Sequence, residues 1–558
     1  MGVPRLFKWI HDNYPECLIP LKEGQTMQDV DLQQDSYELD VNAIIHPVCQ
    51  KMYNYGQPKK GRERFLHKKK QFIPSEKQVF SEICKTINAL KQIVNPRKQL
   101  IIAIDGVAGL SKQSQQRQRR FSSASTRDEK QVFDSNSITT GSEFMYNLSR
   151  YVHVYIQRQV ESDPEWQHLE VIFSNEKVVG EGEHKIIRYM DKNKEQSYCI
   201  HSPDADLIML TIGLDNPNVY IIRENIYRDI DCKYFVVKVS VFRDLILKQL
   251  HWTSIEHEYI SQQTIYDFIL LCFLLGNDFL PHIPSLEISN LGLELILETY
   301  PRIAMNHGHL VYRSKKTREL CLNTKSLCQL FYALSGKEKE LLTKKAKEKI
   351  QFPDTLLLES MNEVIDKDSK AISTLDFNKY RTSYYNKRLH GCEPYDVCME
   401  YFKGLLFVLR YYVDEIPDWH WFYPFHCAPF FMDMYECIED FDNEMTFDKH
   451  IPLSPFEQLL AVLPPQSCKI LPEACRVLIS DDSPIIDFYP VKFEIDLEGK
   501  RQEWEGHPIL PFIDVERLRK SYKTIENKLT EAEKKRTLEG KNIKYINIHG
   551  NVRIIFLH

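Results

Sequence analysis

Acidic residues close a series of short apolar runs in the first half of the chain, and this pattern most constrains the fold. Five runs have the composition of strands: Tyr37–Val41, Gln99–Ile104, Leu169–Ser174, Ser197–His201 and Asn218–Ile222. Helical patterns lie between them, at Glu76–Val94, Glu143–Val160 and Lys185–Asp191. Strands that alternate with helices predict an α/β fold with a mostly parallel sheet and helices on both faces.

Seven carboxylates lie at or soon after apolar runs, at Asp40, Asp105, Glu181, Glu183, Asp204, Asp206 and Asp278. In an open α/β sheet, ligands bind beyond the carboxyl ends of the strands, so we expect these acids to converge on one edge. A single Asp at a strand end is usually a helix cap, but paired ExE and DxD spacings favour a metal site. Oxygen ligands suit Mg²⁺ or Mn²⁺. Two such ions about 4 Å apart can activate a water and stabilise the leaving oxygen of a phosphodiester.

A basic helical stretch follows Asp105 directly. Lys112, Gln116 and Arg119 lie at i, i+4 and i+7 and share one helix face, with Arg120 beside them. Their ammonium, amide and guanidinium groups are suitable donors for a terminal phosphate. A solvated surface helix can have the same composition, so it is the neighbouring carboxylates that favour a phosphate pocket.

Charge and cysteine content limit the classes of protein to which the chain can belong. The net charge of −6 is not typical of a nucleic-acid binder, so the positive charge that RNA needs must be local. A second basic run, Lys59–Lys70, predicts a solvated insertion, with an RNA-contacting loop or a nuclear targeting patch as alternatives. Fourteen cysteines without a CxxC pair indicate reduced thiols rather than a zinc ribbon. We expect a cytoplasmic protein, with the nucleus and a viral origin as alternatives, and no membrane segment or signal peptide.

Long motifs in the chain resemble one known family. MGVPRLFKWI, LDVNAIIH, IDGVA…QQRQRRF, FDSNSITTGSEFM, GEGEHKI, DADLIML and FLLGNDFLPHIPSL are similar to the first block of the Xrn/Rat-type 5′-to-3′ exoribonucleases. YYNKRL, WHWFYPFHCAPF, PLSPFEQLLAVLP, ILPFIDVERL and LTEAEKKR resemble its second block, in the same order. The resemblance runs from the first residue to about residue 540.

The resemblance implies a PIN/5′-nuclease-like fold and a role for each part of the site. The seven acids would be the catalytic ligands of two Mg²⁺ or Mn²⁺ ions. The 5′-phosphate pocket would consist of Lys112, Gln116, Arg119 and Arg120. His46 would stack on a base near the 5′ end, opposite a tryptophan that is either Trp419 or Trp421. The implied activity is processive 5′-to-3′ hydrolysis of 5′-monophosphorylated single-stranded RNA to nucleoside 5′-monophosphates.

The same resemblance predicts how the chain is divided. We expect a catalytic α/β domain over 1–305, a charged helical connection over 306–375, the second block over 376–545 and a short segment over 546–558. Since the sequence stops after the second block, we expect a compact, monomeric form without C-terminal extension domains, with decapping factors as conceivable partners. Two alternatives stay open, a 5′-flap or DNA-directed nuclease of the same superfamily and a non-catalytic RNA-binding protein. The presence of all seven acids disfavours the second.

Overall fold

The structure is a computed structural model that describes residues 3–56, 73–125, 127, 131–190, 195–227, 230–365 and 371–557. The basic run Lys59–Lys70 lies outside the described residues.

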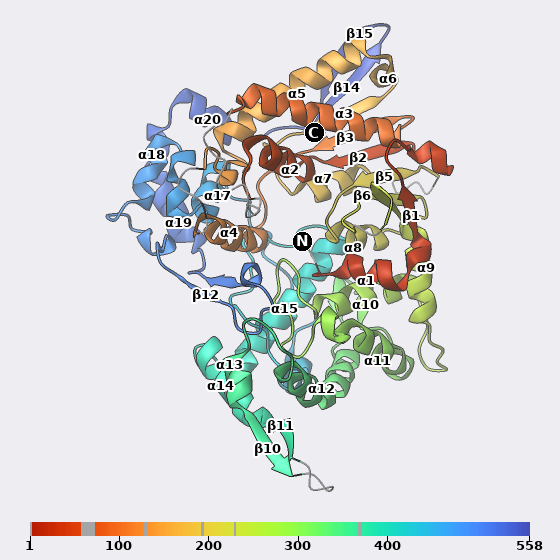
Figure 1. Ribbon diagram of the computed structural model, residues 1–558, viewed down its shortest axis with the longest axis vertical. Coiled ribbons are helices and arrows are strands. Elements are labelled where there is room, and N and C mark those ends of the chain that lie inside the picture. Colours follow the sequence, from red (N-terminus) through yellow and green to blue (C-terminus); the bar gives the residue numbers. More distant parts are fainter. Residues whose placement is uncertain are drawn as a thin grey trace.

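One large sheet organises the described part of the chain (Figure 1). Its strands, in spatial order, are β1 (Leu18–Leu21), β7 (Tyr234–Lys238), β6 (Val219–Glu224), β5 (Tyr198–His201), β2 (Ser36–Asp40), β3 (Gln99–Ala103), β4 (Glu170–Ser174), β14 (Ile543–Ile548) and β15 (Asn551–Phe556). The five strands from β6 to β4 pair in parallel, whereas β7, β1, β14 and β15 add to the two sides in antiparallel fashion. The predicted α/β fold with a mostly parallel sheet is confirmed.

The parallel strands are apolar on both faces because helices cover both. Along β5, Cys199 faces one hydrophobic cluster while Tyr198 and Ile200 face the other, which is the two-residue period of a strand. The first cluster lies under α2 (Asn42–Tyr53), α3 (Glu76–Val94), α5 (Glu143–Ser162) and α6 (Pro164–Gln167). The second lies under α1 (Leu6–Asn13), α8 (Asp206–Ile212), α9 (Val239–Gln249) and α10 (Ser261–Phe273). Buried parallel strands of this kind are expected in α/β proteins.

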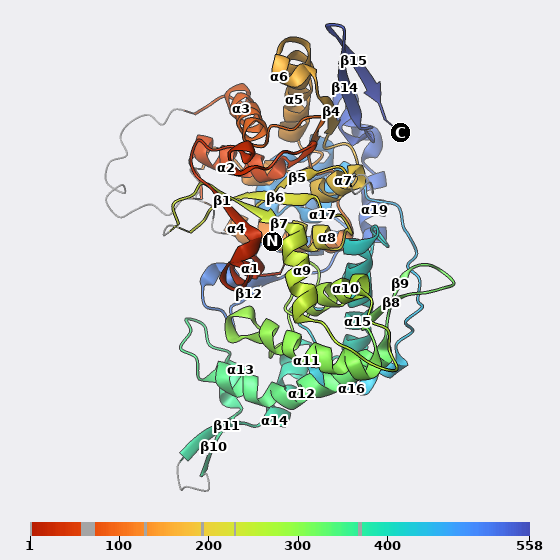
Figure 2. The ribbon, with the colours of Figure 1, turned by 90° about the vertical axis from the view of Figure 1, so that its right-hand side faces the viewer.

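The second half of the chain is mainly helical and packs below the sheet (Figures 1 and 2). Its elements before residue 440 are α11 (Gly292–His307), β8 (Val311–Arg313), β9 (Leu320–Leu322), α12 (Thr324–Ala346), α13 (Thr355–Glu359), β10 (Met361–Ile365), β11 (Ala371–Leu375), α14 (Phe377–Arg388), α15 (Pro394–Val413) and α16 (Phe431–Cys437). Helix α15 contributes Leu405, Leu406 and Leu409 to the same hydrophobic cluster as α8 and α10, so the two halves share one core. None of the described helices combines the length and apolar character that a membrane crossing requires.

The last part of the chain covers the side of the sheet domain that carries α4 (Leu110–Ser125) (Figure 1). It contains α17 (Pro455–Val462), α18 (Glu473–Arg476), β12 (Glu494–Asp496), β13 (His507–Ile509), α19 (Val515–Lys523) and α20 (Glu531–Thr537). Leu110 of α4 lies in one hydrophobic cluster with Phe456 and Leu459 of α17. Buried Arg117 of α4 donates to the carbonyl of Ala461 at 3.0 Å. The second half of the chain therefore holds the basic helix in place.

The fold differs from the sequence prediction at the sides of the sheet. The strands β1, β7, β14 and β15 were not predicted, and β14 pairs with β4 far earlier in the chain. The range 306–375, predicted as a charged connection, includes α12, which buries Leu327, Leu330, Phe331 and Leu334 and exposes most of its charged residues. The division of the chain into four segments stays a prediction.

Candidate active site

The loops that follow neighbouring parallel strands bring the predicted carboxylates together. Asp40 is the last residue of β2, and Asp105 follows the end of β3, which pairs with β2 so that Asp40 lies opposite Ala103. After β4, Glu181 is the N-cap of α7 (Gly182–Tyr189), whose first turn contains Glu183. After β5, Asp204 precedes α8, which begins at Asp206. The carboxyl ends of these strands meet at one edge, as expected for an α/β site.

Asn42 and Gly182 fix the orientation of the two carboxylates nearest the sheet. The backbone N–H of Asn42 donates to Asp40 Oδ1 at 3.0 Å, and its side-chain Nδ2 donates to Asp105 Oδ2 at 2.7 Å. The backbone N–H of Gly182 donates to Asp105 Oδ1 at 2.6 Å. A Cβ atom at position 182 would lie 3.0 Å from Asp40 Oδ1, so a glycine leaves room for both carboxylates.

Asp278 reaches the cluster from a different element. Helix α10 ends at Phe273, and Gly276 then adopts a φ of 85°, a conformation that favours glycine. Asn277 Oδ1 accepts the backbone N–H groups of Phe279 and Leu280 at 2.8 and 2.9 Å, which holds the turn. Asp278 Oδ1 accepts a hydrogen bond from Gln115 Nε2 of α4 at 2.9 Å.

Burial and mutual repulsion leave several of these carboxyls poorly stabilised as anions. Burial, with the charges of Asp105 and Asp204, raises the pKa of Asp40 well above its usual value. Burial and the charge of Asp278 raise the pKa of Asp206 to about 6. Burial also raises the pKa of Glu183 in spite of the nearby Lys112. Buried acids this close together need positive charge between them.

Lys112 of α4 supplies one positive charge. Its Nζ lies 2.8 Å from Glu181 Oε2, 2.9 Å from Asp278 Oδ2 and 4.0 Å from Glu183 Oε1. Burial opposes the charged form of Asp278, but the ammonium of Lys112 lowers the pKa of that carboxyl below its usual value. Burial likewise opposes the charge of Lys112, but Asp278 and Glu181 raise its pKa well above the usual value. One ammonium cannot neutralise seven carboxylates, so the donor set fits added divalent cations.

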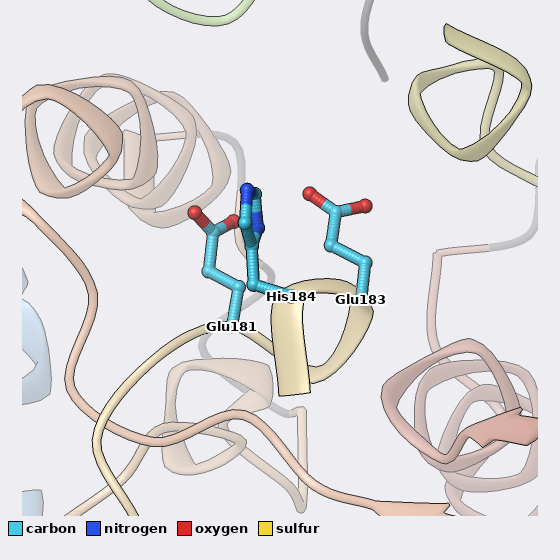
Figure 3. Close-up of side chains that lie close together, drawn as sticks. All are labelled: Glu181, Glu183 and His184. Carbon is cyan, nitrogen blue, oxygen red and sulfur yellow. The ribbon is translucent and has the colours of Figure 1, made fainter. Parts of the chain in front are cut away.

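Figure 3 shows Glu181, Glu183 and His184, three side chains at the start of α7 that point the same way. Their potential ligand atoms all lie within 4.8 Å of one another. His184 Nε2 lies 3.0 Å from the carbonyl of Tyr411, and its Nδ1 is buried without a hydrogen-bond partner among the described residues. Sequence reasoning missed His184, although it stands next to Glu183 in GEGEHKI.

The predicted phosphate-binding residues share α4 but differ in surroundings. Lys112 lies among the carboxylates, and Gln116 is half-buried, with no hydrogen-bond partner for its Oε1 in the described part of the chain. Arg120 donates to the carbonyls of Asn136 and Ile138 at 3.1 and 3.4 Å, whereas Arg119 is exposed. The helix therefore presents a basic face beside the carboxylates, and its role in phosphate binding stays a prediction.

His46 on α2 lies near these arginines. The residue is exposed, yet burial of its ring by the surrounding protein and the charges of Arg120 and Arg119 lower its pKa to about 4. The ring is therefore neutral near pH 7. A neutral imidazole is suited to lie against a base.

The two candidate tryptophans differ clearly in burial. The ring of Trp421 is only 6 % exposed and lies 4.2 Å from the ring of Phe407, centroid to centroid. Trp419 is half-buried, and its carbonyl accepts the backbone N–H of Leu110, the first residue of α4, at 2.9 Å. Trp419 is thus the more exposed of the two candidates, and its backbone lies next to α4, the helix of the predicted phosphate pocket.

The parallel α/β sheet carries a cluster of buried carboxylates at its edge, which is where α/β enzymes have their active sites and is a donor set that divalent cations fit. Two family models extend over nearly all of the chain. The XRN 5′-3′ exonuclease N-terminus matches residues 1–225, and the Xrn1 helical domain matches residues 258–378 and 375–555. The chain belongs to the XRN 5′-3′ exonuclease family. The predicted family is confirmed, and with it the prediction of a 5′-to-3′ exonuclease.

Curated relatives are similar along nearly the whole chain. A 5′-3′ exoribonuclease 2 homolog of Drosophila melanogaster is 29 % identical over 98 % of this chain and 73 % of its own length. The 5′-3′ exoribonuclease 1 of Homo sapiens is 30 % identical over 96 % of this chain, and that of Saccharomyces cerevisiae is 27 % identical over 98 %. The chain spans 35 % of the human relative and 44 % of the yeast relative.

Solved structures are similar at a lower level. The catalytic core of Rad2 in complex with DNA substrate is 13 % identical, with a TM-score of 0.32 over 69 % of this chain and 95 % of that chain. The T5 D15 protein co-crystallized with metal ions is 12 % identical, with a TM-score of 0.26 over 55 % of this chain and 85 % of that chain. At these scores the likeness carries no information on substrate or mechanism.

Proposed function

We propose that the protein is a 5′-to-3′ exoribonuclease that removes nucleoside 5′-monophosphates from single-stranded RNA with a 5′-monophosphate. The proposal rests on one contact. Lys112 Nζ lies 2.8 Å from Glu181 Oε2 and 2.9 Å from Asp278 Oδ2. It places the basic helix directly against the carboxylate cluster. A terminal phosphate bound to that helix would therefore lie close to the carboxylates, with the first internucleotide linkage beside them. Family membership and the names of the relatives support the direction and the substrate.

Two divalent ions, Mg²⁺ or Mn²⁺, are the cofactor that the donor set fits. The seven carboxylates would hold them, because hard oxygen donors are the ligands that these ions prefer. When bound, the ions would activate the attacking water and stabilise the leaving oxygen. Asn42 and the Gly182 N–H fix the orientation of Asp40 and Asp105, two of these carboxylates.

The remaining residues bind and orient the substrate. Lys112, Gln116, Arg119 and Arg120 would bind the 5′-phosphate through charge-assisted hydrogen bonds. The neutral ring of His46 would stack on a base near the 5′ end, with Trp419 as its partner from the second half of the chain. Stacking does not depend on base identity, so it suits an enzyme that removes every nucleotide in turn. Each cleavage leaves a new 5′-phosphate, so one step of translocation restores the substrate.

A pocket of one ammonium, two guanidinium groups and an amide matches one phosphate. A 5′-triphosphate or a cap would overfill it, and a 5′-hydroxyl would lack the charged oxygens that these donors bind. We therefore propose that both kinds of end resist degradation. We also propose that the enzyme acts as a monomer in a reducing compartment, the cytoplasm or the nucleus. The fourteen cysteines, all free thiols, suit such a compartment.

A product assay tests the proposal. RNAs with 5′-monophosphate, triphosphate, hydroxyl and capped ends are incubated with Mg²⁺ or Mn²⁺, beside a matched single-stranded DNA. We expect mononucleotides from the monophosphate RNA alone, and none after chelation of the metal or with Asp204→Ala plus Asp206→Ala. Equal decay of 5′-hydroxyl RNA would contradict the phosphate pocket. Comparable turnover of the DNA would favour a DNA-directed nuclease instead.

A further inference from the structure

Helix α15, from the second half of the chain, ends against the carboxylate cluster. Its residues Tyr411 and Tyr412 are 5 % and 6 % exposed. The Tyr412 hydroxyl donates to Asp206 Oδ1 at 2.8 Å, and the Tyr411 hydroxyl donates to Glu181 Oε1. Two neighbouring side chains of one helix thus bond to two of the predicted metal ligands.

Helical geometry explains how consecutive tyrosines reach different ligands. Successive residues of an α-helix point about 100° apart. Tyr411 is therefore directed to the start of α7, and Tyr412 to the start of α8. Glu181 and Asp206 stand at the N-terminal ends of those helices, so α15 connects both ends at once.

A third hydrogen bond joins α15 to α7. The last four carbonyls of an α-helix have no partner within the helix. Tyr411 belongs to this last turn of α15, and its carbonyl accepts a hydrogen bond from His184 Nε2 at 3.0 Å. The rings of His184 and Tyr411 lie 4.1 Å apart, centroid to centroid. His184, a residue of the site, thus provides the hydrogen-bond partner for this carbonyl at the end of α15.

The tyrosine rings also pack, but packing does not need the hydroxyls. The ring of Tyr411 lies 4.9 Å from that of Phe279, and the ring of Tyr412 lies 5.2 Å from that of Phe273. Phenylalanine would keep these contacts. Core packing therefore does not account for the two hydroxyls. A buried phenol hydroxyl needs a hydrogen-bond partner, and each of these two bonds to a carboxylate.

We propose that Tyr411 and Tyr412 are positioning residues that fix Glu181 and Asp206 for divalent-ion binding. Each hydroxyl bonds to one oxygen of its carboxylate, so the position of helix α15 sets the orientation of both carboxylates. Partners of this kind orient metal ligands in many metalloproteins. The metal site is then complete only when the helical half of the chain is docked. The inference rests on the proposed metal-dependent nuclease function and names residues that complete its site.

The test compares phenylalanine variants of the full-length chain. Tyr411→Phe, Tyr412→Phe and the double variant are titrated with Mn²⁺ in a calorimeter, and their RNA hydrolysis is measured against Mn²⁺ concentration. Tyr423→Phe is the matched control, because Tyr423 is buried and its hydroxyl donates to the Cys427 carbonyl at 2.9 Å. Loss of ligand-orienting partners typically weakens metal binding 10- to 100-fold.

We expect each single variant to bind Mn²⁺ roughly tenfold more weakly, and the double variant more weakly still. Excess Mn²⁺ should restore most of the hydrolysis rate, because the ligands are displaced rather than removed. The control should keep wild-type Mn²⁺ affinity and show a similar thermal stability to the variants. Wild-type Mn²⁺ affinity in the double variant would overturn the proposal, as would a lost rate that excess Mn²⁺ does not restore.

The two proposals can fail separately. If the wild-type chain binds Mn²⁺ but degrades no RNA, the proposed function fails. The calorimetric comparison of the variants then still tests the positioning role of the two tyrosines. If the wild-type chain degrades RNA and the double variant binds Mn²⁺ normally, only the positioning role fails.

Discussion

The ammonium of Lys112 lies 2.9 Å from the carboxylate of Asp278, so one side chain joins the predicted phosphate helix to the predicted metal ligands. That ammonium also contacts Glu181 at 2.8 Å. Without divalent ions it offsets part of the negative charge of these two carboxylates. Bound ions would take over that role and release the ammonium toward a 5′-phosphate. Binding of the metal and of the phosphate should therefore favour each other, because a coupling of this kind acts equally in both directions.

Replacing Lys112 tests this coupling. In Lys112→Met, the carboxylates lose a competing cation, so Mn²⁺ should bind more tightly, by roughly threefold to tenfold. The 5′-phosphate loses a charge-assisted hydrogen bond, which is worth about 1.5–3 kcal/mol. Preference for 5′-monophosphate over 5′-hydroxyl RNA should therefore fall at least about tenfold. Calorimetry with Mn²⁺ and competition kinetics between the two RNAs measure both effects.

Arg119→Met is the control for Lys112→Met. Arg119 belongs to the same basic face but is exposed. Its loss should weaken the end preference and leave Mn²⁺ affinity close to wild type. If Lys112→Met weakened Mn²⁺ binding instead, the ammonium would be supporting the metal site rather than competing for it.

The raised carboxyl pKa values predict how metal stabilisation depends on pH. Asp206 has a folded pKa of about 6, above its ordinary value of 3.8, so the metal-free folded state binds this proton more tightly than the unfolded state. The stability from this proton is present at low pH and is lost as pH rises through about 6. Since the metal competes with protons, the rise in Tm caused by Mn²⁺ should be larger at about pH 8 than at about pH 6.

Thermal melts with Mn²⁺ and with chelator at both pH values measure this difference. Comparing the two melts at each pH removes the titration of groups far from the site. Asp204→Ala plus Asp206→Ala should lose most of the Mn²⁺ effect at both pH values. A metal-induced rise in Tm that is equal at both pH values would show that no proton is displaced.

We expect Trp421 to contribute to the stability of the fold and Trp419 to contribute to RNA binding. Trp421 is buried against Phe407, so Trp421→Ala should cost about 3–5 kcal/mol of unfolding free energy. Trp419→Ala should leave stability nearly unchanged and raise the KM for RNA about tenfold or more, since stacking on one base is worth about 1–3 kcal/mol. Chemical denaturation and steady-state kinetics on both variants distinguish these outcomes. A wild-type KM in Trp419→Ala would remove this residue from the base-stacking site.

The parallel core of the fold could be predicted from sequence because its signals are local. The helix predicted at Glu76–Val94 has the bounds of α3, and all five predicted strands correspond to β2 to β6 within a few residues. The antiparallel strands carry no such signal. Tyr545 of β14 pairs with Val171 of β4, and no local pattern indicates a partner so distant in sequence.

The site was predictable to the extent that acids stand at strand ends. Asp40 ends β2, Asp105 follows β3 and Asp206 begins the helix after β5, and the structure places all three in one cluster. His184 and Tyr412 were missed for different reasons. His184 is not an acid, and a lone histidine is usually structural, whereas Tyr412 stands in an aromatic run typical of a core. Its partner Asp206 is 206 positions earlier in the chain, so only the folded structure brings the two together.

Gly182→Ala tests the carboxylate geometry without changing any charge. The new Cβ would lie 3.0 Å from Asp40 Oδ1 and 3.3 Å from Asp105 Oδ1, so both carboxylates must shift. Alanine is a better helix former than glycine by about 1 kcal/mol, so stability should not fall by much. Mn²⁺ affinity should nevertheless fall about tenfold, because displaced ligands bind a metal less well. Gly336→Ala on α12 is the control, since a Cβ there meets no atom within 4 Å. It should leave Mn²⁺ binding unchanged. If Gly182→Ala bound Mn²⁺ as well as the wild-type chain, Asp40 and Asp105 would not be holding the ion.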